Sequence, residues 1–83
     1  MERYFFHIDY GERSYDEEGT LFVSLDAARN AAVMLLGELL RDEADTFWAK
    51  PDITITGTDA KGLVLWSLMA MGTASGAVSA ARA

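Results

Sequence analysis

The sequence predicts an α+β domain in which an antiparallel sheet of two hairpins carries one helix on one face, in the order β-β-α-β-β. Three observations lead to this prediction. One long stretch has helical periodicity, the segments on either side of it alternate between apolar and polar side chains, and glycines separate these segments. With 83 residues and no cysteine, the chain is expected to form one small domain without disulfides or thiolate metal sites.

The helix is expected over residues 24–43. At about 100° per residue, its apolar side chains gather on one broad face that must be buried. Ser24 can cap the first turn, and Asp26 places a carboxylate at the positive end of the helix. Met34 projects from the polar face, and Gly37 weakens the helix interior. The apolar face is made of Leu25, Ala28, Ala32, Leu35, Leu36 and Leu39.

The first hairpin is expected in the N-terminal part of the chain. Residues 3–10 alternate in a β-prone, aromatic segment and predict the first strand. Gly11 supplies the turn, and residues 12–15 can return as a short second strand. An acidic loop at residues 16–19 follows, and residues 20–23 are extended up to the helix.

The second hairpin is expected after Pro51, which cannot continue a helix. Residues 52–58 alternate Ile and Thr, as in a half-buried strand. After a turn, residues 63–68 form the last strand. The aromatic side chains of Phe47 and Trp48 are expected to fold back over one end of the core.

The domain is expected to comprise residues 1–71, followed by a flexible tail rich in Ala, Gly and Ser at residues 72–83. The formal net charge of −6 argues against nucleic-acid binding, which requires a basic surface. Gly, Ser and Thr interrupt the uncharged C-terminal stretch, so no membrane span is expected. We expect a cytoplasmic location, because cysteine is absent and the N-terminal residues lack a signal-peptide pattern.

Three short motifs resemble a family of short bacterial proteins of unknown function. They are YFFH at residues 4–7, DEEG at residues 16–19 and SLDAARNAA at the start of the helix. The resemblance covers most of residues 3–68 and implies a ββαββ arrangement. It implies no established activity, so it supports the fold and leaves the mechanism open.

The candidate functional surface is the sheet face that the helix does not cover. We expect this face to carry large apolar side chains, which makes it too apolar to be left in water. The chain has little else to lay across it, so the sequence favours a protein partner or a second copy over cover by Phe47, Trp48 and the tail. We therefore expect a non-enzymatic interaction or self-associating module without a cofactor. The possible interaction face consists of Phe5, His7, Val64, Trp66 and Leu68, with Leu63 and Leu65 on the helix side.

Two alternatives come from other functional classes. His7, the one histidine, shares a strand face with Asp9 and precedes the acids at residues 16–18, so a weak metal-dependent or hydrolytic site around them is conceivable. No nucleophile motif or EF-hand spacing accompanies these residues. Nucleic-acid binding is the third hypothesis, because an aromatic side chain on a strand, such as Phe5, can stack on a base. The acidity of the chain disfavours this hypothesis.

Overall fold

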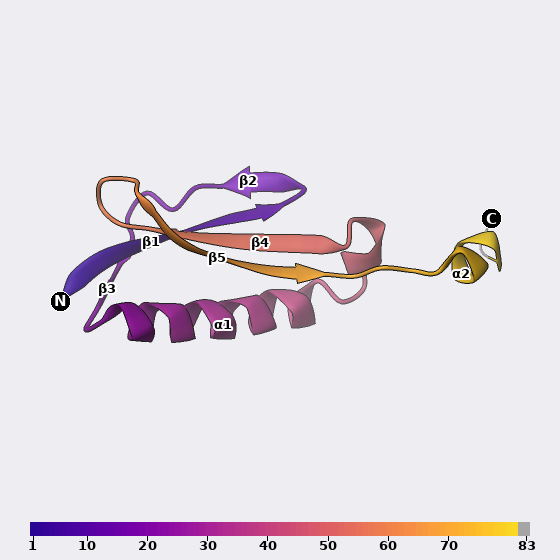
Figure 1. Cartoon of the computed structure of the whole chain (residues 1–83), viewed down its shortest axis with the longest axis horizontal. Helices are drawn as coiled ribbons and strands as arrows, with labels where there is room; N and C mark the ends of the chain where they lie inside the picture. The colour runs from indigo at the N-terminus through magenta and orange to yellow at the C-terminus, as the bar shows by residue number, and fades with distance from the viewer. Residues whose placement is uncertain (82–83) are drawn as a thin grey trace.

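A computed structural model describes residues 1–81 and shows a five-stranded antiparallel sheet with one long helix against it (Figure 1). This confirms the α+β class and the arrangement of strands, helix and strands, with one further short strand before the helix. A 3₁₀ turn follows the long helix, and a short helix ends the described residues. The elements are β1 (Glu2–Tyr10), β2 (Glu12–Ser14), β3 (Thr20–Phe22), α1 (Leu25–Asp42), η1 (Phe47–Ala49), β4 (Asp52–Thr58), β5 (Val64–Met71) and α2 (Gly76–Ala81).

Strand β1 lies inside the sheet and is paired on both sides. On one side it pairs with β4, and on the other it pairs with β2 near its C-terminal end and with β3 near its N-terminal end. Strand β5 pairs with β4 and ends the sheet, so the order is β2-β1-β4-β5. The first strand therefore lies beside a strand of the last hairpin. In this register Phe6, Gly57 and Trp66 lie opposite one another on three adjacent strands.

Helix α1 begins where the sequence predicts. The hydroxyl of Ser24 accepts a hydrogen bond of 3.0 Å from the backbone N–H of Ala27, a cap that typically contributes about 1 kcal/mol. Ala28 and Ala32 are completely buried, because small side chains let the first half of the helix approach the sheet closely. Met34, on the opposite side of the helix, is 70% exposed, as its position in the periodic pattern predicts.

The hydrophobic core is small and lies between α1 and the middle of the sheet. Its buried centre consists of Leu36 from α1 and of Ile53 and Ile55 from β4. Each side chain of this size contributes roughly 1.5–3 kcal/mol when it is fully buried. Partly buried side chains surround this centre and contact it from the neighbouring elements. They are Phe6, Ile8, Tyr10, Leu35, Leu39, Leu40, Phe47, Trp66, Leu68 and Ala70.

The aromatic pair of η1 covers the core less completely than expected. Phe47 packs against the core and stacks on Tyr10, with ring centroids 6.4 Å apart. Trp48 is 63% exposed and meets Phe47 edge-on, so its expected role as part of the lid is wrong. Gly72 passes close to the ring of Trp48, and its backbone N–H donates to the carbonyl of Pro51 at 2.9 Å. The chain therefore stays in contact with the domain up to Gly72.

Beyond Gly72 the chain runs away from the sheet to α2, as Figure 1 shows. The molecule measures 52 × 19 × 18 Å. Its accessible surface is 5988 Å², whereas a compact monomer of 9.1 kDa exposes about 4,900 Å². The extended tail and the uncovered sheet face both contribute to this surface. In the part of the chain that the structure describes, no helix has the length and apolar character needed to cross a membrane.

The surroundings of two glycines predict that their substitution by Ala has opposite effects on the free energy of unfolding. A Cβ atom at Gly57 would overlap the Trp66 ring, so Gly57→Ala should lower the free energy of unfolding by about 1–3 kcal/mol. Nothing lies within 4 Å of a Cβ at Gly37 in α1, so Gly37→Ala should raise it by up to about 1 kcal/mol. Urea denaturation followed by tryptophan fluorescence measures both changes. A Gly57→Ala variant that is as stable as wild type, or more stable, would contradict the packing of Trp66 over Gly57.

Candidate functional site

The structure corrects the expected facing of the last strand. Trp66 and Leu68 pack against the core on the helix side of the sheet, so their expected place on the open face is wrong. Leu65, expected on the helix side, is 37% exposed, and Leu63 precedes β5 and is 62% exposed. The reason lies in the register, which shifts between Val64 and Trp66, so these two residues face opposite sides of the sheet. Trp66 lies opposite Gly57, where the missing side chain leaves room for an indole.

Two residues of the sequence indicate this facing. Ser67 is the one polar side chain of β5, and alternation from an exposed Ser67 turns its two neighbours toward the core. Gly57 interrupts a strand of Ile and Thr, which is typical of a place where a large group approaches the backbone. Trp66 also meets Phe6 edge-on, with ring centroids 5.3 Å apart. Its Nε1 is buried and has no hydrogen-bond partner within residues 1–81, so Trp66 is a core residue and not a contact surface.

The outer edge of β5 is exposed and uncharged. The side chains that alternate with the core residues are exposed to 37% at Leu65, 55% at Met69 and 66% at Met71. β5 pairs with β4 alone among the described strands, so its other side has no strand partner there. Its sequence, VLWSLMAM, contains no charged residue. This edge and the exposed side chains beside it therefore form an apolar surface, to which the expected interaction face contributes Val64.

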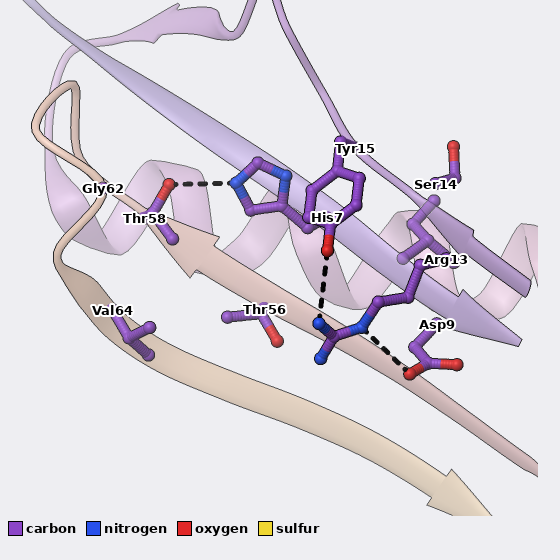
Figure 2. Close-up of a pocket in the computed structure, with 10 residues that line it drawn as sticks. His7, Asp9, Arg13, Ser14, Tyr15, Thr56, Thr58, Gly62 and Val64 are labelled. Carbon is purple, nitrogen blue, oxygen red and sulfur yellow. Dashed lines mark hydrogen bonds and ion pairs between the residues drawn. The ribbon is translucent and has the colours of Figure 1, made fainter.

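The open face also holds a pocket of about 280 Å³ (Figure 2). Phe5, His7 and Val64 lie on this face, as expected, and the last two line the pocket. β1, β4 and β5 form its floor, and β2 with the residue after it forms one wall. The lining residues are His7, Ile8, Asp9, Arg13, Ser14, Tyr15, Thr56, Thr58, Gly62 and Val64.

His7 is held by two hydrogen bonds that also define its tautomer. The backbone N–H of Asp16 donates to Nδ1 of His7 at 3.1 Å, so Nδ1 carries no proton. The proton is therefore on Nε2, which donates to Oγ1 of Thr58 at 3.2 Å. The ring of Tyr15 meets the imidazole edge-on, with centroids 5.6 Å apart. In the described part of the chain both ring nitrogens are occupied, and none of these bonds involves Asp9.

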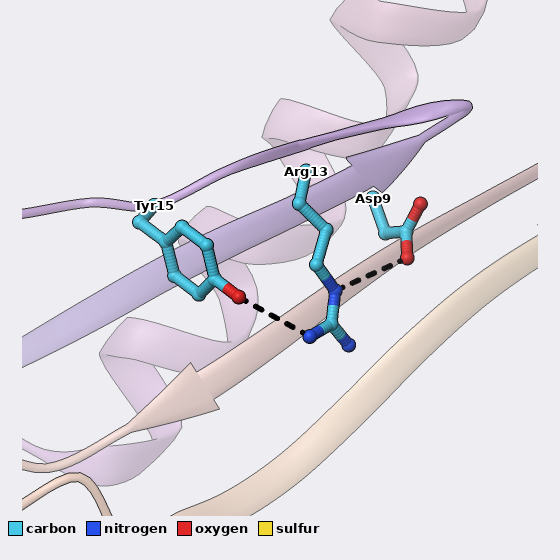
Figure 3. A network of polar contacts seen from close by, with 3 residues as sticks. All are labelled: Asp9, Arg13 and Tyr15. Atoms are coloured by element: carbon cyan, nitrogen blue, oxygen red, sulfur yellow. Dashed lines mark hydrogen bonds and ion pairs between the residues drawn. The ribbon is translucent and has the colours of Figure 1, made fainter.

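Arg13 extends from β2 toward β4 and connects two other residues of the pocket (Figure 3). Its Nε donates to Oδ2 of Asp9 at 3.4 Å, and its Nη1 donates to the hydroxyl of Tyr15 at 3.3 Å. The hydrogen bond with Tyr15 raises the pKa of Arg13 most, and Asp9 raises it further. The side chains of Arg13 and Asp9 are 68% and 48% exposed, so water screens the pair and it adds little to stability.

Asp16 connects the two short strands that share one side of β1. Between β2 and β3 the backbone N–H of Phe6 donates to Oδ2 of Asp16 at 3.1 Å in place of a strand partner. Oδ1 of Asp16 accepts from the backbone N–H groups of Glu18 at 3.2 Å and of Gly19 at 2.9 Å. Burial acts to raise the pKa of Asp16, but the hydrogen bonds from the backbone N–H groups of Gly19, Phe6 and Glu18 outweigh it and lower this pKa. Asp16 is therefore a structural acceptor.

The acidic loop does not gather its carboxylates around one point. The carboxylate of Asp16 turns to backbone N–H groups, while Glu17 and Glu18 are exposed. Within residues 1–81, no group of three or more His, Asp or Glu side chains is arranged to hold a metal ion. His7 is bonded to Thr58 and Asp9 to Arg13. These contacts give no support to a hydrolytic or metal site built on His7 and the loop.

A family model decides the classification of the chain. Residues 3–71 match the model described as "Domain of unknown function (DUF6894)". The chain belongs to this family. The match confirms the resemblance indicated by the three sequence motifs, and it spans both hairpins and α1. No match is found among curated proteins or among solved structures.

Arg13, Tyr15 and Thr58 line the pocket of this DUF6894 domain, and the sequence motifs did not single them out. Asp9 and Arg13 lie directly opposite each other in the β1–β2 hairpin, so counting back from the turn at Gly11 identifies this pair of opposite charges. The same hairpin brings Tyr15 to the pocket. Thr58 is 51 residues away from His7 in the chain, and no local pattern indicates that they meet.

The role of Asp16 predicts a pH-dependent effect of Asp16→Asn. An amide offers one acceptor oxygen instead of two, so at neutral pH the free energy of unfolding should fall by about 1–3 kcal/mol. Because the folded pKa is lowered, the carboxylate stabilises the fold fully above its ordinary pKa of 3.8, and this contribution is lost as the pH falls through the folded pKa. The difference between wild type and variant should therefore shrink in acid.

Urea denaturation between neutral pH and about pH 3 measures this difference. Glu17→Gln is the control, because it removes an exposed carboxylate from the same loop and should change stability by less than about 0.5 kcal/mol. A loss in Asp16→Asn that is the same at every pH would show that the charge of Asp16 does not matter.

Proposed function

We propose that this domain is a non-enzymatic self-association module, in which two copies pair antiparallel along the outer edge of β5. The observation that supports this proposal is an exposed edge strand of eight residues without charge or proline. Proteins usually protect sheet edges with charged residues, proline, short strands or a covering element. The opposite edge has such protection, because it is divided between β2 and β3, each three residues long, and β2 carries Glu12 and Arg13.

One hydrogen bond identifies the backbone groups available for pairing. The backbone N–H of Gly72 donates to the carbonyl of Pro51, the residue before β4. The register of β5 against β4 shifts between Val64 and Trp66, and after this shift backbone groups alternate sides, so those of Ser67 and Met69 point away from β4. A two-fold axis near Leu68 would pair these groups with the same groups of a second copy. Ser67 of each copy would then lie beside Met69 of the other on the open face.

The distribution of charge is compatible with a second copy as the partner. Each chain carries a formal net charge of −6, so two copies repel each other unless their acidic groups stay apart. The acidic loop follows β2, and β2 and β5 lie at opposite ends of the order β2-β1-β4-β5. Three strand spacings of about 4.8 Å exceed the Debye length of about 8–10 Å, so screening weakens the repulsion. The β5 edge itself offers no acidic group to a basic partner.

The length of the edge predicts a weak dimer. Each strand-to-strand hydrogen bond contributes a net value of about 0.5–1.5 kcal/mol. An eight-residue edge buries less surface than the roughly 1,200 Å² of a standard interface. We therefore expect a monomer–dimer equilibrium with a dissociation constant between roughly 1 and 100 μM.

Two matched methionine substitutions test the proposal. Met69→Lys places a charge beside the proposed two-fold axis in both copies, whereas Met34→Lys makes the same change on the surface of α1. Met69 is 55% exposed and Met34 is 70% exposed, so both positions tolerate a long polar side chain. Met69→Lys should raise the dissociation constant at least about ten-fold, and Met34→Lys should change it less than about two-fold. Sedimentation velocity over a wide concentration range measures both.

Ser67→Pro provides a second test, because it removes an outward backbone N–H without removing a bond to β4. It should abolish the dimer while circular dichroism shows an unchanged fold. A wild-type chain that stays monomeric at several hundred micromolar would contradict self-association. Equal weakening by Met69→Lys and Met34→Lys would show that the interface is not at β5.

A further inference from the structure

The hydrogen bonds around the open-face pocket leave two hydroxyl protons unused. The oxygen of Tyr15 accepts from Nη1 of Arg13, and the oxygen of Thr58 accepts from Nε2 of His7. A hydroxyl that accepts a hydrogen bond still has its own proton to donate. Neither hydroxyl donates to another group within residues 1–81. Tyr15 is 63% exposed and presents its donor openly, whereas Thr58 is 5% exposed, so its hydroxyl is reached only from inside the pocket that it lines.

Arg13 adds a positive charge at the same place. Its Nε and Nη1 are bonded to Asp9 and Tyr15, and its Nη2 makes no hydrogen bond within residues 1–81. Figure 2 shows the guanidinium over β4 near Thr56, on the side of the pocket that Tyr15 also faces. A guanidinium stays protonated at any physiological pH, and its planar N–H groups match the geometry of a carboxylate.

The size and walls of the pocket restrict the ligand further. A volume of about 280 Å³ lies just below the range of roughly 300–1,000 Å³ typical of drug-sized ligands. Val64 and the ring of Tyr15 supply apolar surface near the donors. A ligand with one acidic group and a small apolar body, roughly ten non-hydrogen atoms in all, fits this combination.

We propose that the pocket binds a small monocarboxylate. Its oxygens accept hydrogen bonds from Arg13 and from the hydroxyls of Tyr15 and Thr58, and its apolar body lies against Val64. Asp9 is the one carboxylate that lines the pocket, and its bond to Nε of Arg13 compensates its charge. The acidic groups elsewhere in the chain are screened over about 8–10 Å at physiological salt. The pocket lies within one copy, so this binding does not depend on self-association.

Sodium benzoate is the probe for this site, with benzamide as its neutral counterpart. The full chain is titrated with each compound at constant ionic strength and neutral pH and followed by two-dimensional ¹H–¹⁵N NMR. Benzoate should produce saturable shifts at His7, Val64 and the Nε–H of Arg13, with a dissociation constant of roughly 1–10 mM. Benzamide should bind at least about ten-fold more weakly, because it lacks the charge that the guanidinium recognises. The Met69→Lys variant should give the same result as wild type.

Three substitutions test the named donors. Arg13→Gln should weaken benzoate binding about ten-fold or more, and Tyr15→Phe, which removes one hydroxyl, should weaken it about three-fold or more. Arg41→Gln is the control, because Arg41 lies on α1 with its side chain 80% exposed. It should leave the affinity unchanged. The dispersion of the NMR spectrum reports whether each variant is folded, and Tyr15→Phe preserves the test if Arg13→Gln unfolds.

Several results would overturn the proposal. Shifts that do not saturate, or that scatter over the lysine and arginine side chains of the surface, would show that there is no site. Equal binding of benzamide would show that the pocket does not recognise a carboxylate. Unchanged affinity in both Arg13→Gln and Tyr15→Phe would place any binding outside this pocket.

Discussion

One helix has to cover a sheet that has two faces and two edges. The apolar stripe of α1 buries one face, and the burial is complete at Ile53 and Ile55 but partial toward the ends of the sheet. The described chain has no second long amphipathic helix, and α2 is a six-residue segment in the tail. The other face and the β5 edge therefore stay in contact with water. Because α1 covers only one face, the uncharged β5 edge and the pocket on the open face both remain exposed.

The same groups that complete the sheet also arrange the pocket. Asp16 replaces a strand partner for Phe6, and its own backbone N–H donates to His7. That bond leaves the proton of His7 on Nε2, which in turn directs the hydroxyl of Thr58. The orientation of the Thr58 hydroxyl is thus set, through His7, by the backbone of Asp16, whereas Arg13 and Tyr15 are held by their contacts with each other and with Asp9. A substitution at His7 is expected to disturb both the junction of β2 with β3 and the pocket.

Local features of this fold follow from the sequence, and contacts between distant residues do not. The cap at Ser24, the turn at Gly11 and the alternation of Ile53 and Ile55 each depend on neighbouring residues, and the structure has all three. β5 is apolar at every position except Ser67, so alternation there depends on one residue, and the facing of the strand was predicted incorrectly. Asp16 resembles any acidic turn residue, because its partner Phe6 lies ten residues earlier. The pocket could not be predicted, since His7 meets Thr58 across 51 residues of the chain.

The two edges of the sheet differ in a way that limits how far copies could assemble. Pairing of β5 with β5 around a two-fold axis uses one edge of each copy and leaves the β2 edges at the ends of the combined sheet. Each of those ends is divided between β2 and β3, which are three residues long, and β2 carries Glu12 and Arg13 beside the acidic loop, so the ends disfavour pairing with a further copy. A head-to-tail contact of β5 with β2 would instead place an uncharged strand against Glu12 and Arg13, which would lose hydration without gaining partners. The asymmetry of the edges therefore favours a closed dimer over an open chain of copies.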